Sequence, residues 1–187
     1  MISIFACVAA CTVVFFSCAK WKDPKPVTDP RLTNPYCNDP NAVNYNWGFP
    51  GKPDNSLCFY PNSLFVGSYM YYDTMYNDTL FLGADSFIIN ITIPSSSETK
   101  MTLSGFCGGS GSISLTGLPG YEATVDTLVG DTTTFNQGQI MCSAGDTLNG
   151  YILRDRVDSP AVLHFYLQVS QGDTATISHY GSAKLIQ

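Results

Sequence analysis

Charged residues are scarce in this sequence, and few of those present are basic. They make up 13% of the 187 residues, well below the usual share in globular domains, and only nine are Lys or Arg. These nine are scattered along the chain, so the sequence lacks the basic stripe that a nucleic-acid backbone requires. With a formal charge of −6 as well, the composition disfavours nucleic acid as a partner.

Histidine is also scarce, since only His164 and His179 are available as bases near neutral pH. Neither belongs to a nucleophile-elbow pattern or a metal-ligand spacing. Gly108-Gly109-Ser110-Gly111 is glycine-rich but lacks the lysine and the helix of a phosphate cradle. We expect both histidines to be solvated strand residues, and we predict a protein that is not an enzyme and has no cofactor or metal. A secreted hydrolase is the less favoured alternative.

Long apolar runs are absent except at the start of the chain. Ile2–Phe16 is almost wholly apolar and uncharged, and no later run approaches the ~18 residues needed to cross a bilayer. A run of this length is typical of a signal-peptide core. It ends at Phe15-Phe16-Ser17-Cys18, after which the composition changes abruptly to Ala19-Lys20-Trp21-Lys22-Asp23-Pro24.

A small residue followed by cysteine at the end of an apolar core resembles the lipobox of bacterial lipoproteins. The resemblance implies that residues 1–17 are removed and that the Cys18 thiol receives a diacylglyceryl group, with palmitate-like acyl chains. Two or three such chains anchor a protein stably, at ~0.8 kcal/mol per buried CH₂. We therefore expect a lipoprotein of the cell envelope, anchored in the outer membrane on its periplasmic or surface face. An ordinary cleaved secretory signal and an uncleaved N-terminal anchor are the alternatives.

Residues 18–35 are expected to form a tether that starts at the lipid site. Lys20–Pro35 contains four prolines, several charges and no apolar periodicity. Proline-rich segments favour extended polyproline II at ~3.1 Å per residue. We expect a disordered spacer that holds the following domain away from the lipid.

We expect the seven cysteines to fall into three groups: those removed with the signal peptide, the lipid site and those that form disulfides. Cys7 and Cys11 lie within the predicted signal peptide and Cys18 is the lipid site, which leaves Cys37, Cys58, Cys107 and Cys142. An even number in an oxidising compartment indicates disulfides. Of three possible pairings we favour Cys37–Cys58, which encloses one compact loop, with Cys107–Cys142 as the remainder. A zinc site is the rival interpretation, but no close Cys-x₂-Cys pair is present.

Residues 36–61 form a predicted disulfide-closed loop module that is rich in Asn and Asp. Cys37-Asn38-Asp39-Pro40-Asn41-Ala42-Val43-Asn44-Tyr45 and Asp54-Asn55-Ser56-Leu57-Cys58-Phe59-Tyr60 resemble a short motif of exported Bacteroidetes proteins, in which the two cysteines pair. From the residues alone, Asp39-Pro40-Asn41 is turn chemistry. We expect the Asx side chains to cap turns. Calcium is the alternative, through the oxygens of Asn38, Asp39, Asn44, Asn46 and Asp54.

From residue 63 to 187 the dominant period is two. The alternation in Phe87–Ile93 and Ala161–Val169 predicts half-buried strands. Further strand-like runs are Phe65–Tyr72, Lys100–Cys107, Ser112–Thr116, Glu122–Val129, Thr132–Gln139, Thr147–Leu153 and Thr176–Leu185. Turns rich in Gly, Asp and Pro separate them, and no stretch offers a helical stripe with caps. We predict an all-β fold, an antiparallel β-barrel or β-sandwich of about eight or nine strands, in a monomer.

Three short motifs follow one another in this domain: Phe65-Val66-Gly67-Ser68-Tyr69, Thr134-Phe135-Asn136-Gln137 and Tyr180-Gly181-Ser182-Ala183-Lys184. Their order is similar to that in small Bacteroidetes lipoprotein domains described as lipocalin-like or β-sandwich. That family is largely uncharacterised. The resemblance therefore implies a fold and an envelope location rather than an activity.

Aromatic residues near the first strand are the candidates for ligand contact, namely Trp47, Tyr69, Tyr71 and Tyr72. Aromatic rings stack on sugars and line small-ligand cavities, although the same residues also fill cores. We predict a non-enzymatic domain that binds an unknown ligand or envelope partner. A lipocalin-like carrier of a small apolar ligand would need an apolar cavity. A carbohydrate-binding module would need exposed aromatic rings on one face.

Asp-Thr followed by an aliphatic residue or Thr recurs through the domain. It resembles the O-glycosylation motif of exported Bacteroidetes proteins, and the resemblance implies acceptors at Thr74, Thr79, Thr127, Thr132, Thr147 and Thr174. Asp-Thr is also ordinary turn-to-strand chemistry, which is the alternative explanation.

Overall fold

The computed structural model describes residues 27–94, 97–127, 139–140, 142, 146–156, 161–171 and 175–186. The predicted signal peptide (1–17), Cys18 and the first part of the tether lie outside these residues. The described end of the tether contains one turn of 3-10 helix, η1 (Pro30–Thr33). Asp29 caps this turn and also pairs with the Arg31 guanidinium, which lowers the pKa of the Asp29 carboxyl.

The loop module is stapled by the predicted Cys37–Cys58 disulfide. Its elements are β1 (Pro35–Tyr36), β2 (Lys52–Pro53), which pairs with β1 in parallel, and η2 (Asn55–Leu57). As predicted, Asx side chains cap its turns: Asp39 accepts from the backbone N–H of Asn41, and Asp54 accepts from that of Ser56. The Tyr60 hydroxyl donates to Asp39 across the module, a bond that raises the pKa of Tyr60 to about 12.

The larger domain is an antiparallel meander, in which the chain runs up and down between neighbouring strands. Its strands are β3 (Gly67–Asn77), β4 (Leu80–Thr92), β5 (Lys100–Ser104), β6 (Ser112–Leu118), β7 (Glu122–Val125), β8 (Gln139–Ile140), β9 (Asp146–Arg154), β10 (Val162–Gln171) and β11 (Ala175–Leu185). A short helix, α2 (Pro61–Phe65), precedes β3, and a 3-10 turn, η3 (Cys107–Gly109), follows β5.

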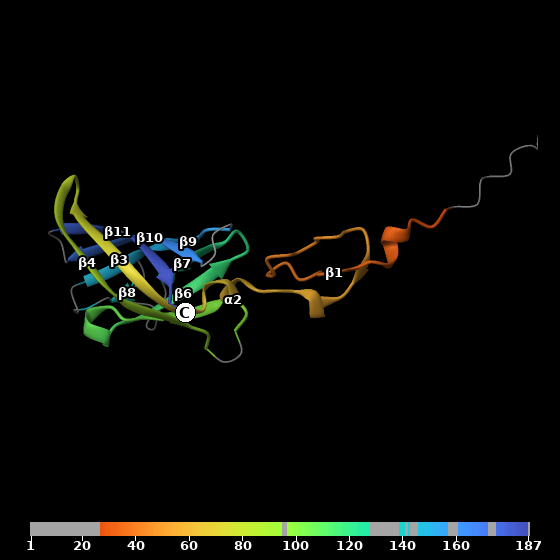
Figure 1. Ribbon diagram of the computed structural model, residues 1–187, viewed down its shortest axis with the longest axis horizontal. Helices are drawn as coiled ribbons and strands as arrows, with labels where there is room; N and C mark the ends of the chain where they lie inside the picture. The colour runs from red at the N-terminus through yellow and green to blue at the C-terminus, as the bar shows by residue number, and fades with distance from the viewer. Residues whose placement is uncertain are drawn as a thin grey trace, which may run out of the picture.

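The meander closes on itself, because β11 pairs with β3 and β9 pairs with β10 (Figure 1). The result is a closed antiparallel barrel of eight strands. The short β8 pairs with β9 beyond the segment that contacts β7. The all-β prediction is therefore confirmed, and the barrel is the form that the structure takes. Closure removes sheet edges that would otherwise expose unpaired backbone groups.

Alternate residues of each strand fill the interior of the barrel. The largest fully buried side chains are Tyr69, Tyr71, Phe65, Phe165, Ile89, Ile91, Met101, Leu103, Ile113, Leu115, Leu148 and Ile152. Each contributes ~1.5–3 kcal/mol through burial. Helix α2 packs against β6, where Gly117 leaves room: a Cβ there would lie 2.7 Å from the Pro61 Cβ. In Figure 1 the loop module lies beyond the α2 end of the barrel.

Two expectations for the strands need correction. No helix was expected in the domain, but Pro61–Phe65 forms one. Pro61 occupies its first position, where proline suits a helix start. The helix was not predicted because five residues are too few to show an apolar helical stripe in the sequence. The first strand consequently begins at Gly67 rather than Phe65 and extends to Asn77. Its partner starts at Leu80, earlier than the predicted Phe87, because the two form one long hairpin around the Asp78-Thr79 turn. The predicted strand 132–139 lies outside the described residues except for Gln139.

The second predicted disulfide, Cys107–Cys142, is also present. It ties η3 to the segment between β8 and β9. Zinc is thereby excluded as the partner of these four sulfurs, since all four are oxidised in pairs.

A polar trio is buried within the barrel. The Tyr71 hydroxyl donates to one oxygen of Asp73 at 3.0 Å, and His179 Nδ1 lies 2.6 Å from the other. Burial, followed by the Asp73 charge and hydrogen bond, raises the pKa of Tyr71 above its usual range. The prediction of a solvated strand histidine was wrong for His179, whose side chain is only 12% exposed. It was right for His164, which lies on the outer face beside Asp155.

Candidate functional site: an aromatic ladder on the outer wall

The outer wall of the barrel carries a row of aromatic rings that crosses five strands. Residues directly opposite each other in antiparallel strands share a face. Tyr151 on β9 is opposite Tyr166 on β10, which is opposite Tyr180 on β11. Tyr76 on β3 follows on the same face and is opposite Phe81 on β4. We call these five residues the aromatic ladder.

Each ring of the ladder contacts the next. Tyr151 and Tyr166 are stacked, with centroids 4.9 Å apart and an interplanar angle of 19°. Tyr180 stands at 77° to Tyr166 and at 61° to Tyr76, with centroids 6.2 and 6.0 Å away. Phe81 lies 5.8 Å from Tyr76. The central Tyr180 is therefore turned out of the plane of both neighbours, and neither covers its face by stacking.

The ladder is open to solvent although it is apolar. Tyr180 is 49% exposed and Phe81 is 56% exposed, and Tyr151 and Tyr166 are exposed as well. Large side chains in a contiguous surface row mark interaction sites more often than single exposed residues do. The row is distinct from the core, because all five rings lie on the outward phase of their strands.

Two grooves run along the ladder and share Tyr180. The first, of about 520 Å³, is lined by Thr74, Tyr76, Asp78, Thr79 and Tyr180. The second, of about 290 Å³, is lined by Gly150, Tyr151, Tyr166, Leu167, Gln168 and Tyr180. Each groove thus combines aromatic rings with hydroxyl, carboxylate or amide groups.

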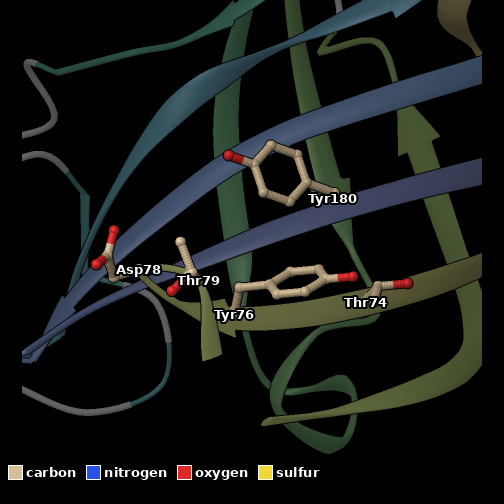
Figure 2. A pocket seen from close by; sticks show the side chains of 5 residues that line it. All are labelled: Thr74, Tyr76, Asp78, Thr79 and Tyr180. Atoms are coloured by element: carbon tan, nitrogen blue, oxygen red, sulfur yellow. The ribbon is translucent and has the colours of Figure 1, made fainter. Parts of the chain in front are cut away.

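Figure 2 shows how the first groove is built. The rings of Tyr180 and Tyr76 lie side by side and point in opposite directions, with Thr74 near one end and Asp78 and Thr79 at the other. The two-residue hairpin turn places this end, since Asp78 adopts a positive φ of 53° that Asp tolerates well. Polar groups therefore flank an aromatic floor.

The electrostatic character of the grooves is simple. Asp78 is the one charged residue among the described residues that line them, and neither lining includes Lys, Arg or His. The other polar groups are neutral hydroxyls and the Gln168 amide, which donate and accept hydrogen bonds. The site is suited to neutral polar ligands and offers nothing to attract an anion.

The aromatic candidates from the sequence separate into three environments. Tyr69 and Tyr71 lie on the inward phase of β3 and are buried in the core, so neither can contact a ligand on the outer wall. Tyr72, on the outward phase, is 50% exposed but lines neither groove. Trp47 is 59% exposed on the loop module, where it contacts Phe59 edge to face.

The threonines of the Asp-Thr pattern are also spread over different environments. Thr74 and Thr79 line the first groove. Thr127 is exposed after β7, and Thr147 is half-buried in β9. Thr132 and Thr174 lie outside the described residues, as does Cys18, the predicted lipid site.

Comparisons with protein-family models, with curated proteins and with solved structures found no match. Among the described residues, no helix has the length and apolar character of a membrane span. The chemistry of the ladder is therefore what bears most directly on function.

None of the five ladder residues was predicted from the sequence as a ligand contact, because most of them are distant from one another in the chain. A usable signal did exist. In Ala161–Val169 the apolar positions fix which residues face inward, so Tyr166 must face outward. The same argument applies to Tyr76, opposite in phase to Tyr69 and Tyr71. Only the register between strands reveals that these outward rings meet.

Proposed function

We propose that this chain is a lipid-anchored carbohydrate-binding protein of the cell envelope, with a non-enzymatic barrel that binds glycans on the aromatic ladder. One observation carries the proposal: five contiguous aromatic rings lie on the outer wall, four of them exposed and Tyr76 half-buried, with neutral hydrogen-bonding groups along two adjoining grooves. The proposal also takes the Cys18 lipid anchor and the exported-lipoprotein resemblance from the sequence.

A sugar presents two kinds of surface, and each needs a different partner. The faces of a pyranose ring expose C–H groups, which are apolar and slightly positive, and an aromatic face carries the negative part of its quadrupole. The rim of the sugar exposes hydroxyls, which need donors and acceptors when they leave water. Tyr180 with Thr74, Thr79 and Gln168 supplies both kinds of partner.

The interior of the barrel is a less favourable place for a ligand. An eight-stranded barrel is consistent with a lipocalin-like binder, but a carrier of that type needs space among its inward side chains. Here Tyr71 contacts Phe165, Phe87 and Phe106 at centroid distances of 4.8, 5.3 and 5.6 Å. Such packing leaves the inward positions occupied, so we favour the outer wall.

Binding to immobilised polysaccharides tests the proposal. We expect the full-length protein, solubilised in mild detergent, to be retained by at least one of cellulose, chitin, mannan, starch or xylan. Tyr180→Ala should weaken retention by about tenfold, since one aromatic contact is worth about a factor of ten. Tyr72→Ala is the matched control, because Tyr72 is equally exposed on the same wall but lines neither groove.

Two results would contradict carbohydrate binding on the ladder. One is failure of the protein to bind any polysaccharide of the panel. The other is an equal loss of retention in Tyr180→Ala and Tyr72→Ala, since that would indicate a nonspecific aromatic surface. Circular dichroism of both variants checks that the barrel remains folded.

Intact mass spectrometry of the native membrane fraction tests the anchor. We expect a chain that begins at Cys18 and carries a diacylglyceryl thioether with its acyl chains. A chain with a free, unacylated Cys18 or with residues 1–17 retained would disprove lipid anchoring. The same spectrum reports whether the chain carries any glycan, and a peptide map assigns it to Thr74, Thr79 or another site.

A further inference from the structure

We infer that the aromatic ladder binds an internal stretch of a linear, neutral polysaccharide, which lies across the strands and has Tyr180 at the junction of two subsites. This inference rests on the proposed carbohydrate binding and adds to it the length, charge and direction of the ligand. A site for a chain end or a single sugar would be organised differently.

The two grooves meet at Tyr180. Both are lined by Tyr180, and they extend from it to opposite sides, toward Tyr76 on β3 and toward Tyr166 on β10. A pocket for a terminal sugar is closed on the far side by groups that hold the last hydroxyls. Here the described lining continues past Tyr180 in both directions, so one ligand can occupy both grooves.

The ladder is long enough for several sugar rings. Its rings come from five adjacent strands of the eight, which are spaced ~4.8 Å apart, so the row measures roughly 20 Å along the curved wall of the barrel. This distance is several sugar rings long. The row also runs perpendicular to the strands, because each ring contacts the ring of the neighbouring strand. The glycan therefore lies across the barrel wall rather than along a strand.

The rings of the ladder are not equally available for stacking on a sugar. Tyr151 and Tyr166 stack on each other, so each has one face covered by its partner. Tyr180 is stacked on neither neighbour. We assign the principal sugar-stacking platform to Tyr180, and a weaker, length-dependent contact to Tyr151 at the end of the second groove.

The charge of the groove lining favours a neutral glycan. The described residues of both grooves include no cation, and Asp78 contributes one negative charge. An anionic glycan would have to approach this carboxylate without any compensating Lys or Arg, which disfavours uronic acid polymers. The hydroxyl and amide groups of Thr74, Thr79 and Gln168 are matched to neutral sugar hydroxyls.

A chain-length series measured by isothermal titration calorimetry tests the inference. The ligands are the disaccharide to the hexasaccharide of whichever neutral polysaccharide retains the protein. The protein is recombinant, with a mass that shows no glycan on Thr74 or Thr79. We expect the affinity to rise about tenfold along the series and then to level off, as the second groove is filled.

Two variants locate this gain. Tyr151→Ala and, as a smaller change on the surface of the same groove, Gln168→Ala should each reduce hexasaccharide affinity several-fold while disaccharide affinity stays unchanged. Tyr180→Ala should weaken the binding of both ligands.

A pair of polymers, one anionic and one neutral, tests the preference for a neutral glycan. The pair is carboxymethyl cellulose with hydroxyethyl cellulose, or polygalacturonate with the neutral polymer that the protein binds. The neutral member of the pair should bind more tightly.

The outcomes separate the inference from the proposed function. Absence of binding to every polysaccharide would overturn both. If a glycan binds at Tyr180 but the disaccharide and the hexasaccharide bind equally well, the carbohydrate function stands and the two-subsite inference fails. It fails equally if the second-groove variants affect both ligands alike, or if the anionic polymer of a pair binds more tightly.

Discussion

Adding one methyl group at Gly181 gives a direct test of how full the barrel is. Gly181 lies on the inward phase of β11, opposite Asp73. A Cβ there would lie 2.2 Å from Cε2 of Tyr71 and 2.5 Å from its Cζ and hydroxyl oxygen. These distances are far below van der Waals contact, so Gly181→Ala requires the Tyr71 ring to move.

The ring has little freedom to do so. It is fully buried, three other aromatic rings surround it, and its hydroxyl is bonded to Asp73. Overpacking of a well-filled core costs typically 1–3 kcal/mol. With the ring held on all sides we expect the upper end, about 3 kcal/mol of unfolding free energy. In a domain of this size that lowers Tm by roughly 10 °C.

Equilibrium urea unfolding of the wild type and the variant measures this cost. Gly83→Ala is the matched control on β4, because its added Cβ would lie 3.5 Å from the Met75 methyl, an ordinary contact. That variant should be neutral or slightly stabilised, as Gly→Ala usually is where the backbone permits. In a Tyr71→Ala background the space taken by the Tyr71 ring is vacant. Gly181→Ala should therefore lower the unfolding free energy much less there than in the wild type.

An unchanged unfolding midpoint for Gly181→Ala would refute the reasoning. It would show that the interior has unfilled space for an extra methyl group beside Tyr71. A barrel with unfilled space at its centre can admit a small apolar ligand. The lipocalin-like carrier would then become the favoured function over binding on the outer wall.

Three further predictions concern the Cys37–Cys58 disulfide and the buried trio of Tyr71, Asp73 and His179. Replacing Cys37 and Cys58 together with Ser should destabilise the loop module by about 3 kcal/mol and expose it to limited proteolysis, with the barrel transition unchanged. The raised pKa of Tyr71 means that the folded barrel keeps a proton that the unfolded chain loses above pH ~10. Stability should therefore fall as the pH rises beyond that value, and Tyr71→Phe should flatten the slope in alkaline urea titrations. Asp73→Ala removes the partner of both Tyr71 and His179, and should lower the unfolding free energy by about 3 kcal/mol in urea. Asp73→Asn should cost clearly less.

The period-two pattern predicted the barrel because burial on one face leaves a local trace in the sequence. Leu163, Phe165 and Leu167 are inward as the alternation required. Closure left no such trace, since it depends on β11 pairing with β3 across more than a hundred residues. A sandwich and a barrel use the same alternation, so the sequence could not decide between them.

The candidate site was less predictable for a related reason. The cluster of aromatic residues near the first strand was the visible feature, but adjacent residues in a strand face opposite ways. Tyr71 therefore went to the core and Tyr72 to the surface. His179 likewise lies on the inward phase of β11, and only the fold brings Asp73 beside it.

The ladder has a competing structural explanation, and the geometry of Tyr180 separates the two. Cross-strand aromatic pairs stabilise sheets by roughly 0.2–1 kcal/mol, which is sufficient reason for the stacked Tyr151 and Tyr166. Tyr180 stacks on neither neighbour, stays half-exposed and lines both grooves. Edge-to-face contacts are favourable in themselves, but those of Tyr180 leave about half of its surface open to solvent. A sugar ring bound in the grooves would cover this exposed surface, which the contacts between the rings leave open. Tyr180→Ala should accordingly cost the barrel less stability than Tyr166→Ala, while costing more in glycan affinity.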